Sequence, residues 1–141
     1  DRAIMDVIQP GQHGSTFGGN PMGTSVAQTA LEVIRDEKLT QNARTLGDLF
    51  RAQMNVYIAD SKIVNLVRGR GLLNAILIND TEDSKTAWNI CLRLRDKGLL
   101  AKPTHGNIIR FAPPLVITEE QLLDCIQIIS STLKEFEPHG S

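Results

Sequence analysis

Residues 63–78 constrain the fold of this chain more than any other stretch. Ile63 and Val64 begin a run rich in branched apolar residues, which two alternate glycines, Gly69 and Gly71, interrupt. Branched apolar residues favour strands, whereas glycines inside such a run mark a bulge or a bend. The pattern therefore predicts two strand segments with a bend or bulge between them.

Two helical stretches precede these strands. Thr24 or Ser25 is the expected cap of the first, because either hydroxyl can accept a hydrogen bond from a free backbone N–H group. The second covers about residues 41–57. Apolar residues at helical spacing give it one buried face, formed by Leu46, Leu49, Phe50 and Met54.

Two more helical stretches follow the strands. Asp83 or Ser84 is expected to cap the third, and Gly98 should end it where a left-handed residue is needed. The last begins with a capping box, in which Thr118 and Gln121 each bond the other's backbone N–H group.

Short apolar strands are expected at residues 99–102 and 107–111, with a turn at residues 103–106. This order of elements predicts an α+β fold. We expect a small antiparallel sheet of three to four strands with helices packed on one face.

Charge and composition narrow the classes of function. The formal net charge is −1, so no excess of Lys and Arg favours a nucleic-acid partner. No apolar run is long enough for a membrane span. The two cysteines, Cys91 and Cys125, lie in helical patterns and are expected to be buried free thiols in a reducing compartment. His13 and His105 have no second ligand at suitable spacing, so no metal site is expected.

The loop of residues 13–21 has a composition that can bind an anion. Its small residues allow close approach of the backbone, and Ser15 and Thr16 supply hydroxyl groups. Phosphate binding is one interpretation. An ordinary Gly-rich connection is the other, and composition alone favours it.

Arg110 is a cation within an otherwise apolar strand that ends at Pro113 and Pro114. A guanidinium can grip a carboxylate with two parallel hydrogen bonds, which makes substrate binding one interpretation. An edge-strand arginine that points to water, or an internal salt bridge, is equally compatible with the pattern.

Arg68 and Arg70 flank Gly69 and point to the same side of an extended strand. They could form a basic rim, but a solvated strand face is the commoner explanation and the one that we favour.

Three stretches together resemble the class III aminotransferases, which are fold-type I enzymes that use pyridoxal 5'-phosphate. They are residues 11–21, residues 67–75, and residues 99–106 continued through residues 110–115. The last two stretches are similar to the ornithine aminotransferase subfamily in particular. Acetylornithine and 4-aminobutyrate aminotransferases share much of the pattern and remain alternatives.

The resemblance implies roles for three residues. In the family, the hydroxyl at the position of Thr16, with Ser15 beside it, binds the phosphate of the cofactor held by the other subunit of a homodimer. Arg110 matches the arginine that binds a substrate carboxylate. In the ornithine subfamily, a glutamate elsewhere in the protein is its alternative partner.

The resemblance also implies a reaction. The δ-amino group of L-ornithine passes to 2-oxoglutarate, which gives glutamate 5-semialdehyde and glutamate. The family's Schiff-base lysine has no counterpart in this chain, because no lysine has the expected neighbours. We therefore expect a C-terminal fragment that is inactive by itself, and we assign it no catalytic residue.

The same resemblance divides the chain into three parts. Residues 1–23 would be an interface and phosphate-binding loop of the large domain. Residues 24–58 would form a linking helix and the following helix, and residues 59–138 the C-terminal small domain. Cytoplasm and mitochondrial matrix are both possible compartments. A non-catalytic dimerisation module is the alternative outside the enzymes.

Overall fold

The computed structural model describes residues 1–138. Backbone contacts divide the chain after Glu37 into two compact units. Within the described residues, no helix is long and apolar enough to cross a membrane.

The first unit contains two helices, α1 (Arg2–Met5) and α2 (Pro21–Asp36), joined by a loop. Helix α2 begins earlier than the sequence analysis predicted. Its N-cap is Asn20, whose side chain accepts a hydrogen bond from the N–H group of Gly23, and not Thr24 or Ser25. Pro21 explains the difference, because the first helical position needs no N–H group and suits the fixed φ of proline.

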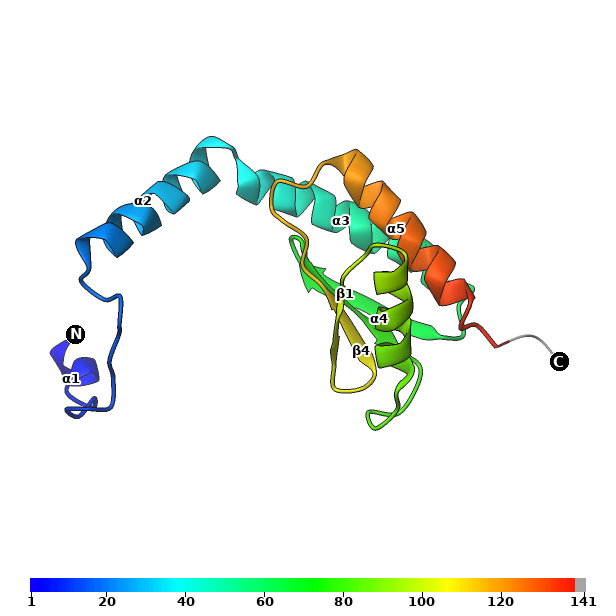
Figure 1. The fold of residues 1–141 in the computed structure, drawn as a ribbon, viewed down its shortest axis with the longest axis horizontal. Helices are drawn as coiled ribbons and strands as arrows, with labels where there is room; N and C mark the ends of the chain where they lie inside the picture. Colours follow the sequence, from blue (N-terminus) through cyan, green and yellow to red (C-terminus); the bar gives the residue numbers. More distant parts are fainter. Residues whose placement is uncertain (139–141) are drawn as a thin grey trace. The chain divides into compact units, whose positions relative to one another are not determined.

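The second unit is an antiparallel sheet covered on one face by helices, as the sequence predicted (Figure 1). The strands are β1 (Val64–Arg70), β2 (Leu73–Ile78), β3 (Lys102–Thr104) and β4 (Ile108–Phe111), in the spatial order β1-β2-β4-β3. The helices are α3 (Leu39–Ile58), α4 (Thr86–Asp96) and α5 (Glu119–Lys134).

The first two strands form a hairpin whose turn lies at Gly71 and Leu72. Gly71 has a φ of +55°, a left-handed conformation that glycine adopts at little cost. The predicted pair of strands is confirmed. The irregularity in strand pairing lies between Val64 and Leu66, away from the glycines.

Strand β3 lies later in the chain than predicted. It covers Lys102–Thr104 in place of residues 99–102, so the turn to β4 starts at His105. Pro103, expected in the turn, therefore lies in a strand although proline cannot donate a ladder hydrogen bond. Here β3 is an edge strand, where a missing donor is tolerated.

The core fills the space between the sheet and the three helices. Strand residues alternate between buried and exposed positions, so one sheet face is covered. The helices α3 and α4 contact that sheet, and both contact α5. The fully or nearly buried side chains include Phe50, Met54, Ile76, Ile90, Ile109 and Ile129. Burial also raises the pKa of the Cys91 thiol to about 11, so this cysteine is an unreactive core residue.

The predicted ends of α4 and α5 are partly confirmed. Both hydrogen bonds of the Thr118–Gln121 capping box form, and Gly98 follows α4 with a φ of +88°. The N-cap of α4 is Lys85, with no side-chain cap bond. Ser84 lies one residue too early to be the cap, although its hydroxyl accepts a hydrogen bond from the N–H group of Thr86 at 3.4 Å.

Glu137, which follows α5, contacts the last turn of α3 and the segment between α3 and β1. Its carboxylate accepts hydrogen bonds from the hydroxyls of Tyr57 and Ser61 and from the N–H group of Lys62. Burial alone raises the pKa of Glu137, but these hydrogen bonds outweigh it and lower the pKa below its ordinary value. Burial, together with the contact with Glu137, raises the pKa of Tyr57 to about 12.

The Glu137 contact makes stability depend on pH. A lowered folded-state pKa means that the carboxylate stabilises the fold above its unfolded-state pKa of about 4.3, and that this contribution is lost as pH falls through the folded-state value. Glu137→Gln should therefore cost about 1 kcal/mol at neutral pH. Urea unfolding at pH 7 and at pH 3 checks this: the difference between wild type and variant should shrink at pH 3, and an unchanged difference would contradict it.

Candidate functional site

Ser15 and Thr16 lie in the exposed loop before α2. The Ser15 hydroxyl accepts a hydrogen bond from the N–H group of Gly18 at 2.8 Å, which closes the loop on itself. A Cβ atom at position 18 would lie 2.9 Å from the Ser15 Cβ, so this tight turn requires glycine. The loop then passes directly to the N-terminus of α2 through Asn20.

Thr16 differs from Ser15 in its hydrogen bonding. Both side chains are exposed. Among the described residues, the Thr16 hydroxyl makes no hydrogen bond, whereas Ser15 is already engaged as an acceptor. Thr16 can therefore offer its hydroxyl to a ligand without breaking a bond within the loop.

Arg110 lies on β4 in the second unit. Because β4 is flanked by β2 and β3, it is an interior strand, and the edge-strand interpretation of Arg110 is wrong. Its side chain is exposed on the outer face of the sheet, opposite the helices, while its neighbours Ile109 and Phe111 are buried. The internal salt bridge also fails to form, because no carboxylate of residues 1–138 lies within 4.0 Å of its guanidinium.

The strand register places Arg110 in one cross-strand row with two other cations, Lys102 and Arg68. Arg110 is paired with Lys102 on β3 and with Ala75 on β2, and Ala75 is paired in turn with Arg68 on β1. All four side chains lie on the outer face, because they share one cross-strand row. Arg68 and Arg70 do project to the same side, and both are exposed.

A buried polar contact supports this part of the sheet from its inner face. One nitrogen of the Arg51 guanidinium, Nη1, donates to Oδ1 of Asn74 at 2.6 Å and to the carbonyl oxygen of Gly71 at 3.0 Å. Asn74 is only 3% exposed, and its own amide also donates to Gly71. This contact fixes the β1–β2 hairpin on α3. Sequence reasoning missed it, because the partners are far apart in the chain.

Comparison with known proteins identifies the class. Residues 1–133 match the family model described as aminotransferase class-III, and the chain belongs to this family. It is 56% identical over 130 residues to the mitochondrial ornithine aminotransferase of Drosophila melanogaster, a match that covers 92% of this chain. The chain spans only 29% of that relative's length.

Two solved structures have the same fold. The acetylornithine aminotransferase of Elizabethkingia anophelis superposes with a TM-score of 0.85 and 65% sequence identity, over 96% of this chain and 34% of that one. An ornithine aminotransferase of Toxoplasma gondii, described with partial occupancy of PLP at its active site, has a TM-score of 0.81 and 41% identity. That match covers 94% of this chain and 31% of that one. The present chain corresponds to the C-terminal portion of these enzymes.

Class III aminotransferases use pyridoxal 5'-phosphate (PLP). The Gly-rich loop has the free hydroxyl and the open backbone that a phosphate group needs. The Thr16 hydroxyl is exposed and free, and a Cβ at Gly14 or Gly19 would meet no atom within 4 Å, so a ligand can approach the backbone there. The Gly-rich loop of residues 13–21 and Arg110 belong to different compact units.

Proposed function

We propose that this chain forms the C-terminal part of a PLP-dependent ornithine aminotransferase. The full protein would transfer the δ-amino group of L-ornithine to 2-oxoglutarate and release glutamate 5-semialdehyde and glutamate. The observation that carries this proposal is Arg110, an exposed guanidinium on an otherwise well-packed strand with no carboxylate partner among residues 1–138. The name of the Drosophila relative supports the choice of ornithine as donor.

Arg110 would bind a carboxylate of the substrate. Its planar fork can donate two parallel hydrogen bonds and so fixes the orientation of the substrate as well as its charge. A glutamate outside the present residues would pair with Arg110 when no substrate carboxylate is there. Such an exchange allows one site to accept a cationic donor and an anionic acceptor in turn.

Thr16 and Ser15 would hold the phosphate of PLP. When bound, the cofactor supplies an electron sink for the carbon from which the proton is removed. Thr16 contributes a hydroxyl donor, and the glycines beside it let backbone N–H groups approach the phosphate. We further propose that this loop serves the cofactor of the second subunit in a homodimer.

The proton transfer would be performed by a lysine outside these residues, so the isolated chain should transfer no amine. Cytoplasm and mitochondrial matrix both remain candidate compartments for the full protein. The Drosophila relative, which is named mitochondrial, favours the matrix.

Acetylornithine is the second candidate donor. The enzyme from Elizabethkingia anophelis, which is named for this substrate, is 65% identical to the chain. A comparison of kcat/KM for the candidate donors distinguishes ornithine from acetylornithine. The full-length product of the gene, loaded with PLP, should transfer amine from L-ornithine to 2-oxoglutarate with a kcat/KM at least about tenfold above those for N-acetylornithine and 4-aminobutyrate. Preference for N-acetylornithine would establish the second candidate, and no transfer from any donor would favour a non-catalytic module.

A further inference from the structure

We propose that Lys102 and Arg68 act with Arg110 as one carboxylate-binding row, and that this row makes the site selective for a dicarboxylate acceptor. The inference rests on the proposed function for the role of Arg110. It extends that function to two residues on neighbouring strands. Lys102 and Arg68 are positioning and specificity residues in this account.

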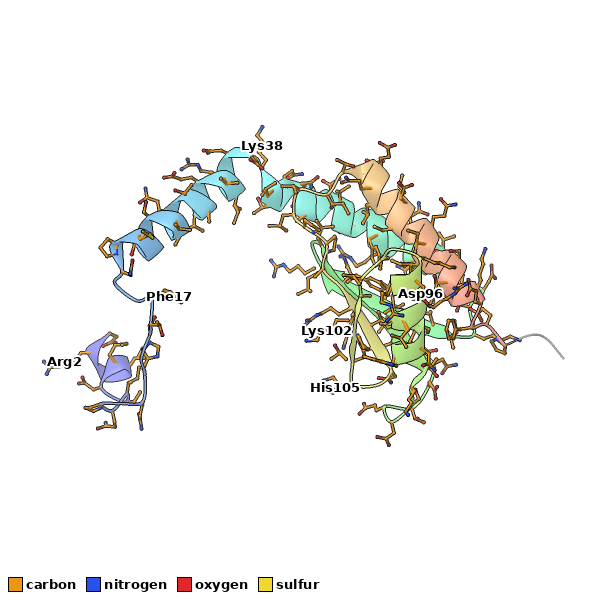
Figure 2. All side chains as sticks on the ribbon, viewed as in Figure 1. Arg2, Phe17, Lys38, Asp96, Lys102 and His105 are labelled. Carbon is orange, nitrogen blue, oxygen red and sulfur yellow. The ribbon has the colours of Figure 1, made fainter. Side chains whose placement is uncertain are left out.

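The geometry of the row follows from the strand register. Lys102 and Arg110 are direct cross-strand partners, and Ala75 separates Arg110 from Arg68. Neighbouring strands lie about 4.8 Å apart, so Arg68 and Arg110 stand about 10 Å apart with only a methyl group between them. Lys102 lies on the side of the sheet away from α4 (Figure 2).

The row is not neutralised by the described part of the chain. None of its three cations lies within 4.0 Å of a carboxylate in residues 1–138. Lys102 and Arg110 are directly opposite each other on adjacent strands. Like charges in this arrangement are destabilising. An anion bound beside both side chains would offset their repulsion.

The substrates of the proposed reaction differ most in charge. Ornithine carries two ammonium groups and one carboxylate, whereas 2-oxoglutarate carries two carboxylates. Arg110 can hold one carboxylate through its fork, and the Lys102 ammonium can add a third donor from the adjacent strand. Arg68 lies on the far side of Ala75 from Arg110 and adds positive potential that attracts a doubly charged anion.

The test compares two variants that each lose one positive charge, one in the row and one on a helix away from it. Lys102→Gln is compared with Lys134→Gln, which lies at the exposed end of α5. Both variants are made in the full-length protein loaded with PLP. Three quantities are measured: the KM for 2-oxoglutarate, the KM for ornithine, and the Kd for glutarate by calorimetry without donor. Glutarate is an unreactive five-carbon dicarboxylate, so its binding does not depend on turnover.

Lys102→Gln should raise the KM for 2-oxoglutarate and the Kd for glutarate about tenfold. Its kcat and its KM for ornithine should stay within about twofold. Arg68→Gln should shift the same two quantities in the same direction, Lys102→Arg should restore them, and Lys134→Gln should leave them unchanged.

An unchanged Kd for glutarate in Lys102→Gln would overturn the inference even if the enzyme transfers amine from ornithine normally. An equal rise of the Kd for glutarate in Lys134→Gln would also overturn the inference, because the loss of affinity would then follow from the protein's net charge and not from the row. A protein that transfers no amine would refute the proposed function, and the glutarate titration would still decide whether the row binds dicarboxylates.

Discussion

Gly47→Ala should lower the free energy of unfolding of the second unit by about 3 kcal/mol. In helix α3, a Cβ atom at this position would lie 1.9 Å from the carbonyl oxygen of Gly71 and 2.3 Å from its carbonyl carbon. Both neighbours are backbone atoms, which cannot rotate away as a side chain can. The hairpin must therefore shift away from α3, and the hydrogen bonds from Arg51 to Gly71 and Asn74 are then strained or lost.

Helix propensity alone predicts the opposite result, that Gly47→Ala raises the free energy of unfolding. Alanine is favoured over glycine in a helix interior by about 1 kcal/mol. Gly23→Ala in α2 is the matched control, because the nearest atom to its added Cβ lies at an ordinary 3.6 Å. Urea unfolding of the full-length variants checks the prediction. A Gly47→Ala midpoint equal to or above that of Gly23→Ala would show that the contact between α3 and the hairpin is looser than described.

Arg110→Ala should lower kcat/KM for 2-oxoglutarate by about 100- to 1,000-fold in the full-length enzyme. Loss of a bidentate, charge-assisted carboxylate contact removes both orientation and charge stabilisation. Arg110→Lys should recover only part of the activity, because a lysine ammonium has no planar fork. The effect on the half-reaction with ornithine should be smaller, since in the proposed exchange Arg110 then pairs with a protein carboxylate.

Separate single-turnover measurements of the two half-reactions, followed by cofactor absorbance, check the Arg110 prediction. Arg70→Ala is the control, because Arg70 lies on the same outer face of the sheet but is paired with Leu73, one row away from the row of Arg110. Its rates should stay within about twofold of wild type. Equal losses in Arg70→Ala and Arg110→Ala, or an unaffected 2-oxoglutarate half-reaction, would remove Arg110 from substrate binding.

Local patterns predicted most of the fold. Periodicity identified the helices α3, α4 and α5 and the β1–β2 hairpin. Both hydrogen bonds of the Thr118–Gln121 capping box were also predicted correctly. These features depend on residues within a few positions of one another. The bounds of β3 were predicted wrongly: Pro103 was assigned to the turn, but it lies in β3, which is an edge strand and so tolerates a proline.

The site was less accessible to sequence reasoning. Arg110, Ser15 and Thr16 were identified as candidates, but their roles depended on the family resemblance. The row that joins Arg110 to Lys102 and Arg68 could not be predicted, because it depends on the register of four strands. The contact of Gly47 with Gly71 depends on the packing of a helix against a turn, for which the sequence carries no local signal.

The origin of the transferred nitrogen tests the central claim most directly. The full-length PLP-loaded protein is incubated with L-ornithine labelled with ¹⁵N at the δ position and with unlabelled 2-oxoglutarate, and the glutamate formed is examined by NMR or mass spectrometry. A δ-aminotransferase should place the ¹⁵N label in glutamate and leave the α-amino group of ornithine in the semialdehyde product. Unlabelled glutamate, or no glutamate at all, would contradict the account.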